Sequence, residues 1–334
     1  MLTRSNAREH HFFVERAQCR TVNAAHDIRA TCSWQTGPTA HVESVGVIAK
    51  VRCQQLPVLG FGTAPVGLSG YQDPKFNQQQ SERESLRALD AAIDHGITFF
   101  DTAPAYANKI PTDGWSTDRA SERMLGQALG SHRCMRDRLF IATKNMFDRM
   151  DANGIRESLN HSLKLLQTDY VDLFQVHGII AKPFRADNWR DFITDEVLET
   201  FMELRREGKV RYIGVTGYRE EALSALIETG VFQVVMPQFN YFYRGAEWEL
   251  VKLAQQYQVA VIPMRPLTGG LMQTMLNELL PGQQPLVNPF KVAMKYILQF
   301  DCVSTIPVGM RTVREVEENV RLVEELEREI GLGR

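Results

Sequence analysis

The sequence predicts a (β/α)8 barrel, the TIM-barrel fold, from three observations. From about residue 56 onward, short apolar runs rich in Val, Ile and Phe alternate eight times with amphipathic segments. The eight repeats span about 275 residues, a usual size for this fold. Gly96, Gly208 and Gly230 stand at helix-to-strand turns, where a left-handed residue is expected to end the helix.

The strands are predicted from short apolar runs that carry β-branched and aromatic residues. Eight runs fit this description in chain order. They are residues 56–63, 97–102, 139–144, 170–177, 210–216, 232–238, 259–265 and 302–308.

The helices between these strands are predicted from apolar residues at helical spacing. Leu86, Leu89 and Ile93 form such a stripe behind the acidic start Ser81-Glu82. Two further stripes are Ile155, Leu159, Leu163 and Leu166, and then Val313, Val316, Val320, Val323 and Leu326. We expect helices near 194–207 and 312–330 to belong to the same ring of helices around the barrel.

A doubly wound sheet is the competing fold, because residues 60–65 read GFGTAP, close to a dinucleotide-binding fingerprint. Pro65 stands where the third glycine of that fingerprint belongs. The glycines are therefore interpreted as close backbone packing at the end of the first strand.

The length of 334 residues suits two average domains, or one large domain with additional residues outside it. The barrel domain is predicted to cover residues 51–334, which leaves residues 1–50 as an N-terminal extension. The first 45 residues hold five arginines, four acidic residues and four of the eight histidines, with weak apolar periodicity. We predict a poorly ordered extension; an organelle-targeting peptide, also rich in Arg and poor in acids, is the alternative.

Composition and charge argue against several classes of protein. A chain with 44% hydrophobic and 23% charged residues is typical of globular proteins. The 38 basic and 40 acidic residues give a net charge of −2, unlike a nucleic-acid binder. No apolar run approaches the roughly 18 residues that cross a bilayer, and residues 1–6 lack the apolar region of a secretory signal. We expect a cytoplasmic protein without a membrane partner.

The cysteine spacing predicts no metal site. Cys19, Cys32, Cys53, Cys134 and Cys302 match no metal-binding or redox motif. An odd number of cysteines in a long chain indicates a reducing compartment.

Reactive side chains end three neighbouring strands. Asp101 and Tyr106 follow the second strand, Lys144 ends the third and His177 ends the fourth. Taken singly, each has a structural explanation as a cap, a solvated cation or a core histidine. Active sites of barrels lie at the carboxyl ends of the strands, so together these four residues predict a catalytic site.

The combination predicts proton transfer by Tyr106. A lysine ammonium about 4 Å away would lower the tyrosine pKa by up to about three units from its usual value of about 10. Asp101 is expected to be the counter-ion of Lys144, and His177 to hydrogen-bond the substrate oxygen. None of these side chains is a hydride donor, so an acid beside a carbonyl implies a nicotinamide cofactor.

The same segments resemble the aldo-keto reductase superfamily of NAD(P)H-dependent (β/α)8 barrels. Residues 101–106 read DTAPAY, 142–144 read ATK and 172–177 read DLFQVH, matching the family's Asp/Tyr/Lys/His tetrad in order and spacing. Residues 121–126 and 208–215 match further family blocks. The resemblance covers about residues 56–325. It implies reduction of an aldehyde, ketone or sugar hemiacetal, or oxidation in the reverse direction.

The resemblance also implies a cofactor site, with two departures from the family pattern. Gly217 replaces an asparagine that holds the nicotinamide amide, and Met264 replaces an aromatic residue that stacks on the ring. Arg265 is expected near the cofactor phosphates, and Arg311 near a 2′-phosphate, which favours NADP(H) over NAD(H). The predicted cofactor residues are Gly62, Thr63, Asp101, Thr216, Gln238, Met264, Arg265, Leu267, Gly269, Gly270, Gly309, Arg311, Glu315, Glu318 and Asn319.

Substrate recognition is expected from two long loops, 107–119 and 178–194. Each carries a tryptophan, Trp115 and Trp189, which is predicted to line the substrate pocket beside Tyr106 and His177. The alternative is that these tryptophans only cover the barrel rim.

Two other functions remain open from the sequence. The first is a regulatory protein that senses the state of a nicotinamide cofactor with little turnover. The second is an aldolase that uses Lys144 as a Schiff base. The sequence does not define the oligomeric state.

Overall fold

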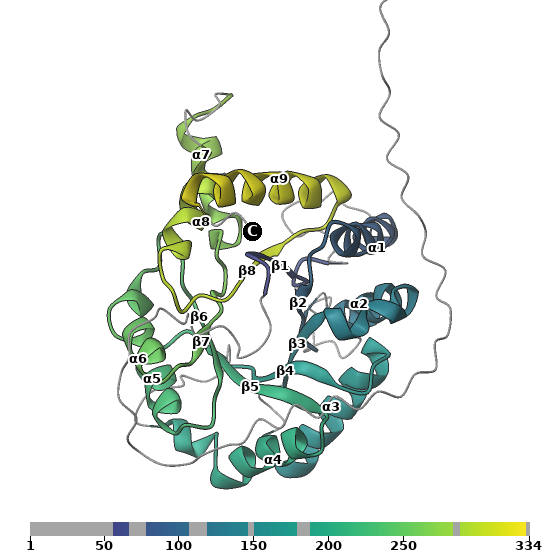
Figure 1. Cartoon of the computed structure of the whole chain (residues 1–334), viewed down its shortest axis with the longest axis vertical. Coiled ribbons are helices and arrows are strands. Elements are labelled where there is room, and N and C mark those ends of the chain that lie inside the picture. Colours follow the sequence, from purple (N-terminus) through teal and green to yellow (C-terminus); the bar gives the residue numbers. More distant parts are fainter. Residues whose placement is uncertain are drawn as a thin grey trace, which may run out of the picture. The chain divides into compact units, whose positions relative to one another are not determined.

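Eight parallel strands form one continuous sheet, as the alternation of apolar runs predicts (Figure 1). The computed structural model describes residues 56–66, 78–106, 119–145, 150–178, 188–282 and 288–331. Each strand overlaps one of the eight predicted runs. The strands are β1 Leu59–Gly62, β2 Phe99–Asp101, β3 Phe140–Asn145, β4 Val171–Val176, β5 Val210–Gly217, β6 Val234–Pro237, β7 Ala260–Val261 and β8 Ile306–Gly309.

The order of the strands confirms the barrel topology. It runs β7-β6-β5-β4-β3-β2-β1-β8, so β8 pairs with β1 and every other neighbour is consecutive in sequence. The ring closes through Val261 of β7, whose N–H donates to Cys302 O at 2.9 Å while its carbonyl accepts from Ser304 N at 3.0 Å.

The seventh strand is much shorter than the predicted run 259–265. Pro263 has no N–H to donate to a sheet ladder, so regular pairing stops at Val261. A single bridge between Gln238 and Met264 continues the contact between the two chain segments. The eighth strand likewise begins at Ile306, because residues just before it pair only with Val261.

Helices surround the sheet in the order predicted. The apolar stripe of α3 is buried over its whole length, and Val316, Val323 and Leu326 of the α9 stripe are buried as well. The helices are α1 Gln78–Asp94, α2 Ala120–Ser131, α3 Ala152–Leu166, α4 Asp195–Arg206, α5 Glu220–Glu228, α6 Leu250–Gln256, α7 Leu271–Leu279, α8 Pro289–Leu298 and α9 Val313–Ile330. Four short 3-10 helices lie between them: η1 Arg133–Arg138, η2 Trp189–Asp191, η3 Gly245–Glu247 and η4 Thr268–Gly270.

Local sequence signals define where these helices begin and end. Thr312 and Glu315 form a capping box at the start of α9, which satisfies backbone N–H groups that have no partner within the helix. The three glycines predicted to end helices all have positive φ: 81° at Gly96, 75° at Gly208 and 73° at Gly230.

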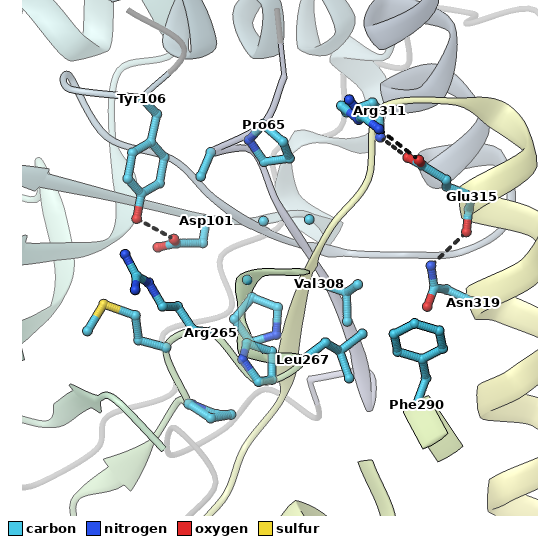
Figure 2. Close-up of a pocket in the computed structure, with 18 of the residues that line it drawn as sticks. Pro65, Asp101, Tyr106, Arg265, Leu267, Phe290, Val308, Arg311, Glu315 and Asn319 are labelled. Carbon is cyan, nitrogen blue, oxygen red and sulfur yellow. Dashed lines mark hydrogen bonds and ion pairs between the residues drawn. The ribbon is translucent and has the colours of Figure 1, made fainter. Parts of the chain in front are cut away.

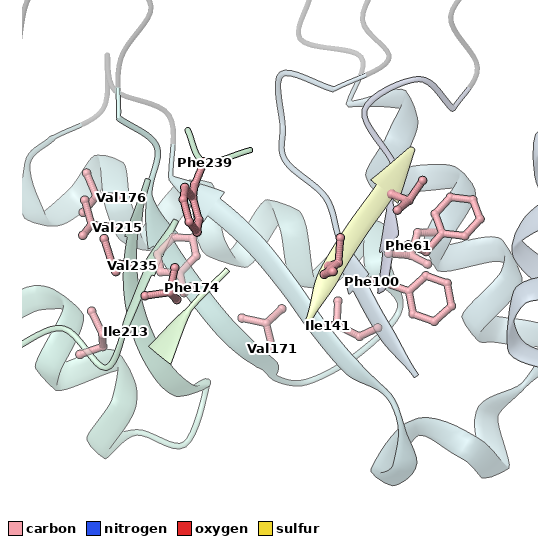
Figure 3. Packing of buried hydrophobic residues seen from close by; sticks show 14 of the residues in the cluster. Phe61, Phe100, Ile141, Val171, Phe174, Val176, Ile213, Val215, Val235 and Phe239 are labelled. Carbon is pink, nitrogen blue, oxygen red and sulfur yellow. The ribbon is translucent and has the colours of Figure 1, made fainter. Parts of the chain in front are cut away.

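Two hydrophobic clusters lie on opposite faces of the sheet. The smaller one fills the barrel interior and includes Phe99, Phe140 and Leu173. Their neighbours in sequence point outward and pack under the helices. Figure 3 shows Phe100, Ile141 and Phe174 in this larger cluster. Because successive side chains alternate between faces, continuous apolar runs supply both clusters.

The predicted extension, residues 1–50, lies outside the described residues. All described residues belong to one compact unit, Gly46–Arg334. The boundary of the barrel domain at residue 51 therefore stays a prediction. In the described part of the chain, no helix combines the length and apolar character needed to cross a membrane.

A glycine on α2 provides a test of the helix packing. A Cβ at Gly126 would lie 1.9 Å from Leu165 O, whereas one at Gly130 would meet only the Gln167 side-chain end at 2.9 Å. We expect Gly126→Ala to lower the free energy of unfolding by about 3 kcal/mol. Gly130→Ala, the matched control, should be neutral or stabilising by up to about 1 kcal/mol. Denaturant unfolding measures both, and equal stability of the two variants would contradict the packing.

Candidate active site

The predicted catalytic residues meet at the carboxyl ends of adjacent strands. Asp101 is the last residue of β2, Lys144 lies near the end of β3 and His177 directly follows β4. Tyr106 lies in the turn after β2, where its N–H donates to Ala103 O at 3.0 Å. Parallel pairing of β2, β3 and β4 brings the four side chains to one rim of the barrel.

Lys144 and Asp101 form a buried ion pair. Lys144 Nζ lies 2.6 Å from Asp101 Oδ1 and donates to Thr102 O at 2.9 Å. The two residues are 1% and 3% exposed, so neither charge is screened by water. Burial raises the pKa of Asp101 and lowers the pKa of Lys144, and the attraction between the two charges opposes both shifts.

A second buried carboxylate supports β3 from behind. Glu122 on α2 accepts from Thr143 Oγ1 at 2.7 Å and pairs with Arg119 at 3.4 Å. Burial raises the pKa of Glu122, and the guanidinium of Arg119 counters this shift. The sequence identified this acid only as part of a family block; its place behind Lys144 is a finding of the structure.

Tyr106 is held against the ion pair by several contacts. Its hydroxyl donates to Asp101 Oδ2 at 3.4 Å, and Lys144 Nζ lies 4.5 Å from the centre of its ring. The His177 ring meets the Tyr106 ring edge-on, with the two centroids 6.0 Å apart. The hydroxyl faces the pocket shown in Figure 2.

The expected lowering of the Tyr106 pKa by Lys144 is wrong for this structure. Burial raises the pKa of Tyr106 well above 10, and the neighbouring Asp101 carboxylate raises it further. The ammonium lies over the ring face and is paired with Asp101, so its charge does not act on the hydroxyl as a separate cation. Among the groups that shift this pKa, Arg265 is the one that lowers it. The phenol is therefore a proton donor in this state.

His177 is held in its neutral form. Burial lowers its pKa to about 3, and the nearby Lys144 ammonium acts in the same direction. A neutral imidazole can donate a hydrogen bond from one ring nitrogen to a substrate oxygen.

A cavity of about 890 Å³ runs along the carboxyl ends of the strands. Tyr106 and Asp101 line one end, and Arg311, just before α9, lines the other (Figure 2). His177, beside Tyr106, also lines the cavity. Most of the predicted cofactor residues share this wall. They are Gly62, Asp101, Met264, Arg265, Leu267, Gly269, Gly309, Arg311, Glu315, Glu318 and Asn319.

The remaining predicted cofactor residues lie next to this wall. Thr63 is buried and its hydroxyl donates to Asp101 O at 3.0 Å. The Thr216 hydroxyl accepts from Gly178 N at 3.0 Å at the end of β5. Gln238 is half-buried beside Met264, and Gly270 ends η4.

The predicted substrate tryptophans are not part of the described pocket. Trp189 is 4% exposed and packs in the large hydrophobic cluster, so its position corrects the expectation that it lines the pocket. Trp115 lies outside the described residues.

The pocket also contains residues that the sequence did not single out. Tyr218 lines the cavity directly after β5. Its position one residue beyond the end of a strand could have identified it from the sequence as a pocket residue. Phe290 and Asn288 come from the start of α8, where Asn288 caps the helix. Nothing in the sequence indicated that α8 reaches the pocket.

The start of α9 arranges several polar groups at the far end of the cavity. Glu315 Oε2 accepts from Arg311 N at 2.6 Å, and Glu315 Oε1 lies 3.5 Å from Arg311 Nη2. Asn319 donates to Glu315 O at 2.8 Å one turn further along. The N-terminus of a helix favours an anion, and Arg311 adds a positive charge beside it.

The fold and the site are those of a barrel oxidoreductase, and comparison with known proteins defines the family. A model of the aldo/keto reductase family matches residues 58–285. The chain belongs to the aldo/keto reductase family, an enzyme family of oxidoreductases, which confirms the resemblance seen in the sequence.

Individual relatives support the same conclusion. An L-galactose dehydrogenase of Arabidopsis thaliana is 28% identical over 302 residues, covering 82% of this chain and 86% of the relative. The holo form of an aldo-keto reductase from Bacillus halodurans is 27% identical with a TM-score of 0.61, covering 80% and 86% of the two chains. An aldo/keto reductase from Klebsiella pneumoniae in complex with NADP and acetate is 23% identical with a TM-score of 0.60, covering 82% and 91%, and shows the fold.

The neutral state of His177 makes a prediction about acid stability. The unfolded chain binds a proton at this residue below about pH 6.5, whereas the folded protein does not until about pH 3. As the pH falls through this window, the free energy of unfolding of wild type should therefore decrease by up to about 1.4 kcal/mol per pH unit relative to that of His177→Gln. Urea unfolding at several pH values measures the difference. A His177→Gln profile that runs parallel to that of wild type would refute the neutral state.

Proposed function

We propose that this chain is an NAD(P)H-dependent oxidoreductase that reduces an aldehyde, ketone or sugar hemiacetal, with Tyr106 as its general acid. The observation that carries the proposal is the Tyr106 hydroxyl, which faces the cavity and is hydrogen-bonded to an acid that is itself ion-paired with buried Lys144. The family membership supports the same reaction class. In the reverse direction the enzyme would oxidise an alcohol or sugar, as the name of the Arabidopsis relative describes for that protein.

The walls of the cavity fit a dinucleotide. Its volume of about 890 Å³ lies within the range of cofactor pockets. Gly309 lies against Pro65, where an added Cβ would be 3.0 Å from Pro65 Cγ, so the backbone forms the wall there. The left-handed turn at Gly269, with φ of 63°, exposes backbone beside the cavity. Most of the residues expected to hold the cofactor thus lie along this one cavity.

The chain's own residues position and transfer the proton. A bound reduced nicotinamide would supply the hydride to the carbonyl carbon. Tyr106 donates its proton to the carbonyl oxygen, and the raised pKa of its hydroxyl keeps that proton available. Neutral His177 donates a hydrogen bond to the same oxygen and fixes its place beside Tyr106. Asp101 and Lys144 hold the tyrosine in place, through its hydroxyl and its ring face.

The two other functions have less support. An aldolase needs a lysine that can reach the substrate, but Lys144 is 1% exposed and donates to Asp101 and to Thr102 O. A sensor of the nicotinamide state would use the same cofactor residues with little turnover. Turnover measured over a panel of aldehydes, ketones and sugars separates this alternative from the proposed enzyme.

Substitution of the proposed general acid tests the mechanism. Tyr106→Phe should lower kcat for aldehyde reduction by about a hundred- to ten-thousandfold. Binding of NADPH, followed by its fluorescence, should not change because the ring remains in place. The control Tyr257→Phe removes an exposed hydroxyl on the outer helices and should keep wild-type turnover. Near-wild-type turnover of Tyr106→Phe would show that another group supplies the proton.

Arg311 is proposed to select NADPH by pairing with its 2′-phosphate. Loss of charge-assisted hydrogen bonds in Arg311→Met should weaken NADPH binding by about ten- to a hundredfold. NADH lacks this phosphate, so its Kd should not change. Arg328→Met, near the C-terminal end of α9 and far from Arg311, is the control. Equal losses for both cofactors would contradict the proposed role, and tighter binding of NADH by wild type would reverse the cofactor preference.

A further inference from the structure

Arg265 is a cation at the catalytic end of the pocket. In Figure 2 its guanidinium extends toward the Tyr106 hydroxyl, and Arg311 lies at the opposite end of the cavity. Arg265 Cζ lies 5.8 Å from the centre of the Tyr218 ring, within cation–π distance. Within the described residues, this guanidinium is in no ion pair with a carboxylate, whereas Arg311 is paired with Glu315. The role predicted for Arg265 near the cofactor phosphates stays a prediction.

The backbone holds Arg265 in an unusual conformation. Its φ is 55°, in the left-handed region that a residue with a side chain rarely adopts. The Arg265 carbonyl is fixed from two sides, since it accepts from Asn240 Nδ2 and from Thr268 N, both at 2.9 Å. Asn240 is fully buried. Strained residues persist where the surroundings enforce them, and they concentrate at functional sites.

Near Tyr106, the charged groups other than Arg265 cancel one another, so Arg265 makes this end of the pocket positive. The Asp101 carboxylate is neutralised by Lys144 at 2.6 Å, and His177 carries no charge. The remaining described acids that line the cavity, Glu315, Glu318 and Glu325, all belong to α9. Figure 2 shows Glu315 beside Arg311, away from Tyr106. An anion beside Tyr106 would meet Arg265 without facing an uncompensated carboxylate.

We propose that Arg265 binds an anionic group of the substrate, so that the enzyme prefers carbonyl compounds that carry a carboxylate. The inference rests on the proposed function, because Tyr106 defines where the carbonyl oxygen lies. A guanidinium suits this task since its planar fork matches a carboxylate with two hydrogen bonds. The cofactor pyrophosphate is the other source of an anion, but the guanidinium is turned toward Tyr106.

A matched pair of substrates tests the proposal. We would measure kcat/KM with NADPH for para-carboxybenzaldehyde and for its uncharged methyl ester. In Arg265→Met the ratio of the value for the carboxylate to the value for the ester should fall by about ten- to a hundredfold. Arg265→Lys should recover part of the loss because the charge remains. Arg133→Met, on the surface of η1, controls for net charge.

Two outcomes would overturn the proposal. Equal losses for the acid and the ester would show that Arg265 acts on the reaction itself. A weaker NADPH affinity of Arg265→Met, with the ratio of the two substrates unchanged, would show that the arginine binds the cofactor pyrophosphate.

Failure of the proposed function would give a different result. Wild type would then reduce neither aldehyde. Calorimetric titration of the free protein with benzoate and benzamide still tests the anion site. Benzoate should bind to wild type and lose affinity in Arg265→Met, and no preference of wild type for benzoate over benzamide would refute the site.

Discussion

The ion pair between Lys144 and Asp101 is the interaction on which the site depends. Removing two charges from water costs more than their attraction commonly returns, so buried ion pairs are poor sources of stability. Here the pair lies at the junction of β2 and β3, with both residues almost fully buried. Tyr106 contacts both partners, through its hydroxyl and its ring face. We therefore propose that the pair supports Tyr106 as an acid that holds and releases one proton.

The surrounding barrel excludes water from this ion pair and holds β2 and β3 in their alignment. Phe99 and Phe140 fill the interior on the same strands that carry the charged residues, and Glu122 supports β3 from the helix layer. The open side of the site is a long cavity whose two ends differ in charge. Arg265 makes the end beside Tyr106 positive, and at the other end Arg311 lies beside acids of α9.

The sequence was sufficient for the topology and for residues that follow strand ends. Parallel strands must bring their carboxyl ends together, so Asp101, Lys144 and His177 were placed correctly from strand order alone. Three-dimensional detail decided the rest. The Tyr106 pKa depends on whether the ammonium faces the ring or the hydroxyl. The direction in which the Arg265 side chain points depends on its left-handed backbone conformation. This conformation is rare for residues other than glycine, and no sequence pattern indicates it.

The most direct test of this account is a double-mutant cycle on kcat with Asp101→Asn, Lys144→Met and the combined variant. If the two residues act as one unit under Tyr106, each single substitution should remove most of the rate. The combined variant should then be about as slow as the slower single variant. Rate losses that simply multiply would contradict the account, because they would mean that Lys144 and Asp101 contribute independently.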